Sequence, residues 1–262
     1  MKILDRSGTK INNIPLSDMG LVLTSPISIG GATAATSFVE VPGMDGSLDL
    51  SLRNAQGAAY FGRRDITLQL ATVGTFDEVA RARSILGYYN GQDVYVFDAR
   101  FGGEWHGTLT LGEWVDHVES WDGQISATVT ATVAAEPTLL MLSKAVEFAP
   151  RTQASDVFSV SIAGNRATWP TFVLTPNRTS TVIGVRVEDA SGRSLGSARY
   201  SQLAVISDTF VIDCERSLVT SGGEMKPVSI MEDFPALVPG VVRITPIGCS
   251  SATMSYRSRV ML

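Results

Sequence analysis

Residues 125–133 read Ile-Ser-Ala-Thr-Val-Thr-Ala-Thr-Val, and this stretch decides the fold class. Every second residue from Ile125 to Val133 is apolar, and the residues between them are Ser or Thr. A period of two places the apolar side chains on one face of a strand and the hydroxyls on the other. One face is therefore expected to pack on a core and the other to meet water, as in an antiparallel sheet.

The same alternation recurs twice upstream. Leu48, Leu50 and Leu52 alternate with polar residues, and residues 65–71 repeat the pattern. Both stretches are predicted as half-buried strands. A shorter apolar run, residues 38–41, ends at Pro42-Gly43-Met44-Asp45-Gly46, whose Pro and Gly residues predict a turn or an exposed loop.

Between these strands the period changes to that of a helix. Thr75 followed by Glu78 fits a capping box. Apolar residues then recur at spacings of three and four, which predicts a helix over about residues 76–89 with one buried stripe; the stripe consists of Val79, Ala82, Leu86 and Tyr89. Gly91 supplies the stop signal. No other stretch predicts a helix convincingly.

The end of the 125–133 strand, Ala135-Glu136-Pro137, marks the predicted domain boundary. We expect an N-terminal domain of residues 1–137, a β-sandwich or barrel-like fold with one helix. Residues 138–262 show short predicted strands with turn residues between them and no helical period. That spacing favours a β-sandwich or jelly roll. The chain as a whole is predicted to be mainly β.

Composition and charge restrict the function. The chain has 262 residues, of which 44% are hydrophobic and 18% charged, so there is ample material for packed cores. Its net charge is −5, with 9 basic and 16 acidic residues in 1–137 against 12 basic and 10 acidic in 138–262. This balance excludes a strongly basic nucleic-acid binder. No apolar run approaches the roughly 20 residues of a membrane helix, and no signal peptide is apparent, so we expect no membrane insertion.

Residues for catalysis or metal binding are sparse. The two histidines, His106 and His117, both lie in strand-like segments far from the two cysteines, Cys214 and Cys249. A structural zinc site is therefore not expected, and the cysteines read as buried thiols, although spacing alone leaves their pairing open. His117 and Asp116 could be combined with a serine, but any β-rich chain offers as much. No cofactor is expected, and the chain is predicted not to be an enzyme.

Carboxylate pairs and aromatic residues leave one alternative function. Glu188-Asp189 and Glu232-Asp233 are adjacent residues near turns, a poor arrangement for a glycosidase. The aromatic residues favour core or interface packing, but a sugar-stacking platform is the alternative; the set comprises Trp105, Trp114, Trp121, Trp169, Tyr88, Tyr89 and Tyr95. A carbohydrate-binding module or adhesin for host glycans is therefore the second hypothesis.

Residues 39–49 read Val-Glu-Val-Pro-Gly-Met-Asp-Gly-Ser-Leu-Asp. This stretch looks like the "PGxxG" segment of the siphophage tail family, which includes the distal tail protein. The strand at Arg64–Leu68, the helix, the strand at Asp93–Asp98 and the Ala135-Glu136-Pro137 ending follow in matching order. In the second half, Val211-Ile212-Asp213, Ser229-Ile230 and Asp233–Gly240 are similar to the family's C-terminal domain.

The resemblance implies a structural virion protein at the tail tip. It implies a hexameric ring formed by the N-terminal domain and a galectin-like C-terminal domain. The ring would join the major tail tube protein to the tail-tip protein or baseplate, and the C-terminal domain would hold a receptor-binding protein in some phages. DNA would pass through the channel without specific binding. The protein would be made in the bacterial cytoplasm and reside in the virion tail.

The loop Pro42-Gly43-Met44-Asp45-Gly46 is the candidate for subunit contact. Its turn chemistry predicts exposure, yet apolar strand residues flank it on both sides. An ordinary hairpin loop is the competing interpretation. The Pro235–Gly240 stretch is expected only to turn the chain in the second domain.

Overall fold

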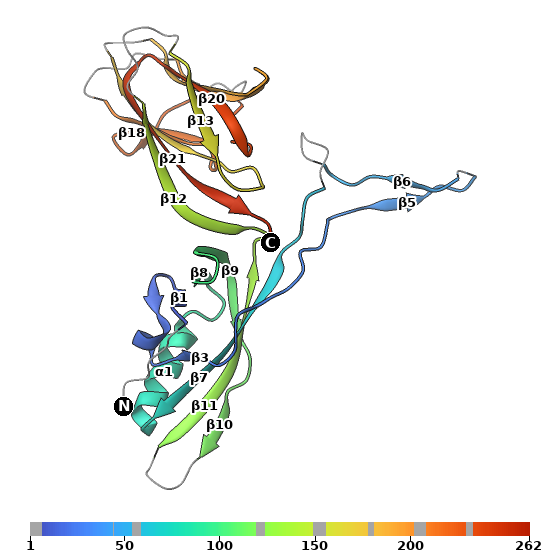
Figure 1. Ribbon diagram of the computed structural model, residues 1–262, viewed down its shortest axis with the longest axis vertical. Helices are drawn as coiled ribbons and strands as arrows, with labels where there is room; N and C mark the ends of the chain where they lie inside the picture. The colour runs from blue at the N-terminus through green and yellow to red at the C-terminus, as the bar shows by residue number, and fades with distance from the viewer. Residues whose placement is uncertain are drawn as a thin grey trace. The chain divides into compact units, whose positions relative to one another are not determined.

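The computed structural model describes residues 7–43, 45–53, 59–118, 124–148, 156–177, 181–201, 208–228 and 233–262. The chain separates into two compact units, Met1–Leu139 and Leu140–Leu262 (Figure 1). The sequence places this boundary after residue 137, and the roles predicted for the two halves stay predictions at this point. The prediction of a mainly β chain is confirmed.

The N-terminal unit is built around one antiparallel sheet. Its elements are β1 (Lys10–Ile11), β2 (Ile14–Pro15), the 3-10 helix η1 (Leu16–Met19), β3 (Val22–Leu23), β4 (Ser28–Ile29), β5 (Phe38–Glu40), β6 (Ser47–Asp49), β7 (Arg64–Gly74), α1 (Phe76–Tyr88), β8 (Asp93–Asp98), β9 (Gly103–Leu111), β10 (Val115–Val118) and β11 (Ile125–Ala135). Strand β11 pairs along its whole length with β7, and β9 and β10 share its other edge. Among the described strands the sheet stays open and does not close into a barrel.

The two alternating stretches 65–71 and 125–133 form the middle of this sheet. Val133 lies opposite Ile66 and Ala131 opposite Leu68, so the apolar residues of both strands share one face. These side chains are fully buried. The other face carries a row of threonines, including Thr67, that are only partly buried. The predicted division into a packed and a solvated face is therefore confirmed.

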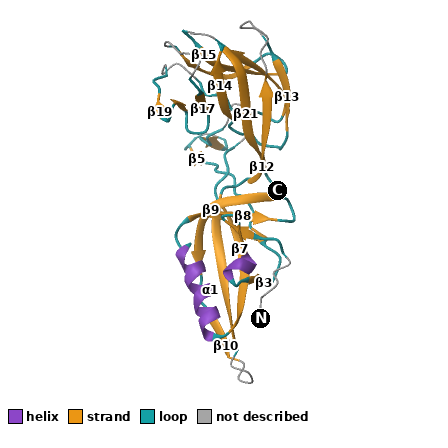
Figure 2. Ribbon diagram, turned by 90° about the vertical axis from the view of Figure 1, so that its left-hand side faces the viewer, coloured by secondary structure: helices purple, strands orange, loops and turns teal. Residues whose placement is uncertain are grey.

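Helix α1 covers the packed face of the sheet beside β7 (Figure 2). Thr75 caps it, with the Glu78 backbone N–H donating to the Thr75 hydroxyl and the Thr75 N–H donating to the Glu78 carboxylate at 2.8 Å. Val79, Ala82 and Leu86 are buried as predicted, while Tyr89 is only partly buried. The prediction of a helix at this position is confirmed.

The C-terminal unit is a β-sandwich of two sheets. Its strands are β12 (Leu139–Phe148), β13 (Phe158–Ile162), β14 (Thr171–Pro176), β15 (Ile183–Asp189), β16 (Ser194–Tyr200), β17 (Phe210–Asp213), β18 (Leu218–Ser221), β19 (Glu224–Met225), β20 (Gly240–Ile247) and β21 (Cys249–Val260). One sheet has the order β19-β18-β17-β14-β21-β12, and the other has the order β13-β20-β15-β16. Phe172 and Met254 of the first sheet share a core with Val185 and Ile244 of the second.

Strand β12 and the short strands β1 to β4 are not predicted from the sequence. The burial of β12 alternates only irregularly, with four consecutive exposed residues from Leu142 to Ala145. The Pro235–Gly240 stretch does more than turn the chain, because buried Leu237 exchanges both backbone hydrogen bonds with Thr168. None of the described helices has the length and hydrophobicity to span a membrane.

Candidate subunit interface

Strands β5 and β6 form a separate two-stranded ribbon (Figure 1). They pair antiparallel, with Phe38 opposite Asp49, Val39 opposite Leu48, and Glu40 opposite Ser47. Every described residue from 35 to 50 is exposed. Two strands without a covering layer are marginally stable in water, so this ribbon lacks the packing that holds the other strands.

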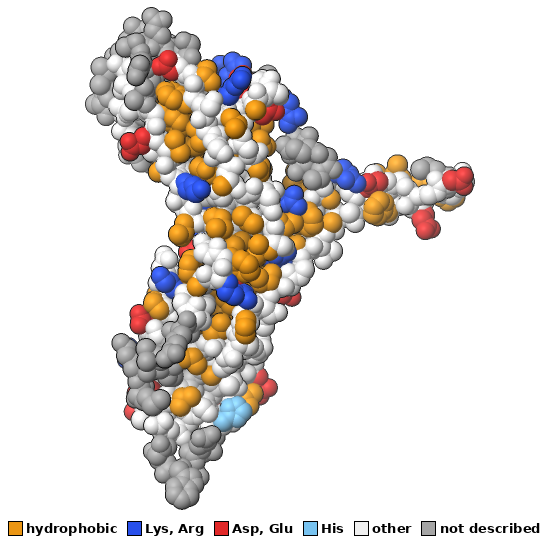
Figure 3. Space-filling view, in the orientation of Figure 1, with side chains coloured by type: hydrophobic (Ala, Val, Ile, Leu, Met, Phe, Trp, Pro, Cys, Tyr) orange, Lys and Arg blue, Asp and Glu red, His pale blue; other side chains and the backbone are white. Residues whose placement is uncertain are grey.

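One face of the ribbon is apolar. Opposite residues in an antiparallel pair share a face, as do residues two apart on a strand, so Val39, Val41, Leu48 and Leu50 lie on the same side. Their exposed fractions are 43%, 39%, 44% and 54%, respectively. Figure 3 shows apolar side chains along the ribbon beside acidic ones. We call these four residues the apolar ribbon face.

The prediction that residues 48–52 form a half-buried strand is wrong for the isolated chain. Strand β6 is shorter, at Ser47–Asp49, and Leu52 is 77% exposed. An alternating pattern indicates that one face of a strand is suited to burial, but it does not determine which part of the chain, or which other molecule, covers that face. An exposed run of apolar side chains of this kind is a candidate interaction surface.

The predicted contact loop forms the tip of the ribbon. Pro42, Gly43, Asp45 and Gly46 are exposed, while Met44 lies outside the described residues. Gly43 and Gly46 have φ values of 85° and 86°, a conformation that strongly favours glycine. The tip therefore depends on its glycines. The sequence prediction named the loop and the apolar strand residues that flank it, but it placed the subunit contact on the loop and not on the strand face that includes Leu48 and Leu50.

A polar cluster fixes the chain where it leaves β6. The Ser51 backbone N–H donates to Asp49 Oδ1 at 2.9 Å, and Arg53 Nη2 donates to Asp49 Oδ2 at 2.6 Å. Hydrogen bonds from Ser51 and Arg53 lower the pKa of Asp49 to about 2. The Ser51 hydroxyl in turn accepts the Ser37 N–H at 2.9 Å, which ties the two halves of the ribbon together.

The groups considered for catalysis have structural partners. His106 Nδ1 lies 3.1 Å from Glu136 Oε1, and its ring stacks on Tyr95. His117 Nε2 lies 3.3 Å from the Thr128 hydroxyl. Asp116 pairs with the Arg83 guanidinium rather than with His117. Among the described residues no group of three His, Cys, Asp or Glu side chains could hold a metal ion.

Of the two carboxylate pairs, Glu188-Asp189 lies at the end of β15, where the hairpin to β16 begins. The Ser191 hydroxyl and the N–H groups of Arg193 and Ser191 donate hydrogen bonds to Asp189, which lowers the pKa of its carboxyl group. Glu188 pairs with the Arg186 guanidinium. Of the other pair, Glu232 lies outside the described residues, as does the Ser229-Ile230 motif.

The aromatic residues of this set that the structure describes do not all lie on one exposed surface. Trp105 is fully buried in the N-terminal core, Tyr88 lies exposed at the end of α1, and Trp121 is outside the described residues. Trp169 alone among the set belongs to the C-terminal unit, where it is 39% exposed. Core packing therefore explains Trp105, whereas Trp169 is exposed and lies in the other unit.

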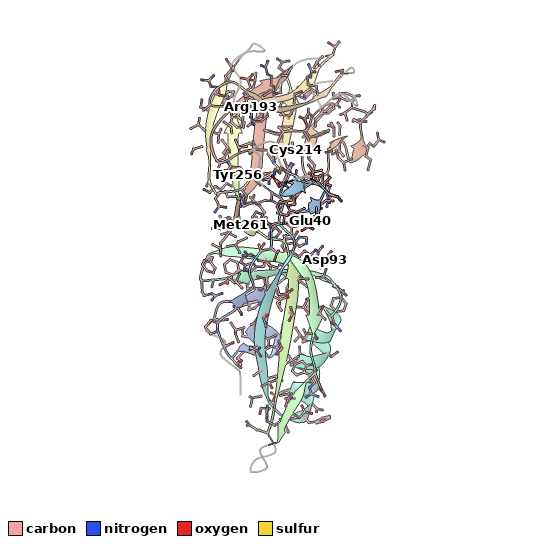
Figure 4. The ribbon with its side chains drawn as sticks, turned by 90° about the vertical axis from the view of Figure 1, so that its right-hand side faces the viewer. Glu40, Asp93, Arg193, Cys214, Tyr256 and Met261 are labelled. Carbon is pink, nitrogen blue, oxygen red and sulfur yellow. The ribbon has the colours of Figure 1, made fainter. Side chains whose placement is uncertain are left out.

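Both cysteines are buried thiols in the core of the C-terminal unit. Figure 4 labels Cys214, whose N–H donates to the Pro170 carbonyl just before β14 begins, whereas Cys249 pairs with Pro176 at the other end of β14. The length of β14 therefore separates them, too far for a disulfide. Burial raises the pKa of Cys214 to about 12 and that of Cys249 to about 11.

The chain has two β-rich units and an exposed ribbon with one apolar face, and it is similar in sequence and fold to known phage proteins. Residues 163–259 match the family model of the siphovirus-type tail component, C-terminal domain. The C-terminal unit therefore carries this phage tail domain, and the resemblance to the siphophage tail family is confirmed. No curated protein sequence matches the chain significantly.

Solved phage structures share the fold over nearly the whole chain. The SPP1 Dit protein, described as a paradigm of the hub adsorption apparatus of phages that infect Gram-positive bacteria, is 13% identical with a TM-score of 0.64. That alignment covers 96% of this chain and 98% of SPP1 Dit. A chain of the phage p2 baseplate in its activated conformation with Sr is 11% identical with a TM-score of 0.52, covering 95% and 97%.

Proposed function

We propose that the chain is the distal tail hub of a siphophage-type tail and has a structural rather than an enzymatic role. The tail-component domain in residues 163–259 is the observation that carries this proposal. The shared fold with a phage hub protein and a baseplate chain supports it. The N-terminal unit forms a hexameric ring, and the protein resides at the virion tail tip after synthesis in the bacterial cytoplasm.

The ribbon forms the contact between neighbouring protomers in this proposal. The apolar ribbon face docks on the next copy, and the Pro42–Gly46 tip lies at that contact. Fully burying a Val or Leu side chain contributes about 1.5–3 kcal/mol, so four such residues repeated around a ring give a substantial driving force. Closed rings are a common form of homo-oligomer because they leave no interface unsatisfied.

The ring connects two tail parts and leaves a channel. The major tail tube protein lies on one side and the tail-tip protein on the other, and the C-terminal unit holds a receptor-binding protein. Acidic groups among the 16 of residues 1–137 face the channel, where they repel passing DNA. A ring structure with a basic channel lining would contradict this part of the proposal.

Light scattering across a concentration series tests the ring directly. The wild-type chain is expected at six times its 28.0 kDa protomer mass. A double variant, Val39→Asp with Leu48→Asp, is expected at one protomer mass, because two carboxylates on the apolar ribbon face prevent docking. A wild-type monomer at every concentration, or a hexameric double variant, would contradict the proposal.

The control for this test is the double variant Glu40→Ala with Ser47→Ala. These residues lie on the opposite face of the same two strands. The control is expected to keep the wild-type mass. All three proteins should show the same circular dichroism spectrum, since no ribbon residue is buried in the protomer core.

A further inference from the structure

The C-terminal unit carries an exposed tryptophan that the hub role does not use. Trp169 lies two residues before β14, the central strand between β17 and β21. Thr171 at the start of β14 pairs with Asp213 on β17 and with Ser255 on β21. Continuing this register by two residues brings Trp169, Glu215 and Arg257 to the same end of the sheet.

These residues lie on the outer face of the sheet. The neighbouring positions Phe172, Ile212 and Met254 point into the core and are buried. Because side chains alternate along a strand, positions 171, 213 and 255 face outward, and so do positions two residues further on. Figure 4 labels Tyr256, on the core side of β21, and Met261 just beyond the end of that strand.

An arginine and a carboxylate hold the indole in place. The Arg259 guanidinium lies over the Trp169 ring, 4.9 Å from its centroid, and so covers one face of the indole. Arg259 Nη2 donates to Glu215 Oε1 at 2.6 Å; the Arg259 side chain is 15% exposed and the Glu215 side chain is 60% exposed. The ring, the guanidinium and the carboxylate thus form one cluster on a partly exposed surface, with hydroxyls of Thr171 and Ser255 following along the sheet.

We propose that this cluster is a binding site for an uncharged saccharide. The apolar C–H face of a sugar stacks on the exposed part of the indole that Arg259 does not cover, and its hydroxyls can donate to the Glu215 carboxylate, which is the exposed partner of the ion pair. The charges of Glu215 and Arg259 cancel, so the cluster does not favour an anionic sugar. This function would give the C-terminal unit a weak contact with surface glycans, independent of ring formation.

The indole N–H signals of the full-length chain in a nitrogen–proton correlation spectrum test the site. The four tryptophans give four such signals, and Trp169→Phe identifies that of Trp169 by its loss. Methyl β-galactoside, methyl β-glucoside and N-acetylglucosamine are the probes. At least one is expected to shift the Trp169 signal saturably. No saturable shift with any of the three would overturn the proposal.

Trp114 is the matched internal control. The Arg83 guanidinium lies 5.1 Å from its ring centroid, so it forms the same kind of pair in the N-terminal unit. Its signal is expected to stay unchanged in the titration. An equal shift at both tryptophans would indicate non-specific contact and overturn the proposal.

Variants separate binding from folding. Trp169→Ala is expected to weaken saccharide binding, followed for the variants through the proton signals of the saccharide itself, by at least about tenfold. Glu215→Ala, at an exposed turn position, is expected to weaken it by about tenfold with little change in melting temperature. Wild-type affinity in Glu215→Ala would overturn the proposal even if Trp169→Ala failed to fold. The hexamer mass is expected to be unchanged, so this test and that of the ring fail independently.

Discussion

Strands β6 and β7 begin from the same kind of sequence and end in opposite environments. Leu48, Leu50 and Leu52 alternate with polar residues as Ile66, Leu68 and Leu70 do. The second set is fully buried beneath α1, whereas the first is exposed in the protomer. A pattern of period two therefore encodes a face suited to burial, and the surroundings decide whether the chain itself or another molecule covers it.

The largest expected effect comes from truncating the buried set. Leu68→Ala should lower the free energy of unfolding of the protomer by about 2–5 kcal/mol, because it leaves a cavity in the packed face of β7. Urea unfolding followed by circular dichroism measures this change. A loss below about 1 kcal/mol would show that the sheet face is less well packed than the structure indicates.

The same substitution on the ribbon should separate folding from assembly. Leu48→Ala is expected to change the free energy of unfolding of the protomer by less than about 0.5 kcal/mol, since the side chain is 44% exposed. It should instead weaken ring formation, seen as a lower mass at low concentration. Destabilisation equal to that of Leu68→Ala would mean that the ribbon packs on its own chain.

Removing the Thr75 cap tests how much helix α1, which packs on β7, contributes to the stability of the protomer. Thr75→Ala deletes the hydroxyl that accepts the Glu78 N–H and should cost about 1 kcal/mol of protomer stability. Thr75→Ser keeps the hydroxyl and serves as the control. The mass of the assembly should not change with either variant, because Thr75 is not part of the ribbon, in which β5 and β6 pair with each other. An equal loss of stability in Thr75→Ala and Thr75→Ser would show that the hydrogen bond of the cap does not account for the loss.

The ribbon tip should respond to a change of backbone preference. Gly43→Val places a β-branched residue at a φ of 85° and should strain the tip by about 1–2 kcal/mol. There is open space around that position, so the strain comes from the backbone alone. We expect reduced hexamer yield with a normal melting temperature of the protomer core. An unchanged yield would indicate that the tip is an ordinary hairpin loop.

The smallest effect concerns the pH response of the ribbon. The pKa of Asp49 falls from 3.8 to about 2 on folding, so the contribution of this carboxylate to ribbon stability is present above pH 3.8 and lost as the pH falls towards 2. The Ser51 amide signal should therefore titrate near pH 2 rather than near pH 4. Asp49→Asn should abolish this titration; a midpoint near 4 in the wild type would contradict the hydrogen-bonded cluster.

Prediction from the sequence succeeds where the local sequence pattern and the tertiary packing favour the same structure. The Thr75–Glu78 capping box and the stripe Val79, Ala82 and Leu86 located α1 because both depend on spacing within one turn or two. Strand β12 was missed because half of it is exposed and carries no regular alternation. Sequence also named the Pro42–Gly46 loop, but the apolar ribbon face needs the pairing of Val39 with Leu48, which only the register supplies.

The sequence by itself determined the mainly β fold class, the position of α1 and the division of polar and apolar residues on β7 and β11. These features follow from periodicity and capping, which act between residues close in the chain. Only the tertiary structure decided which alternating strand is buried, that Cys214 and Cys249 are kept apart by β14, and that Trp169, Arg259 and Glu215 meet. Such contacts join residues distant in sequence, and their geometry is fixed by strand order and register rather than by local preference.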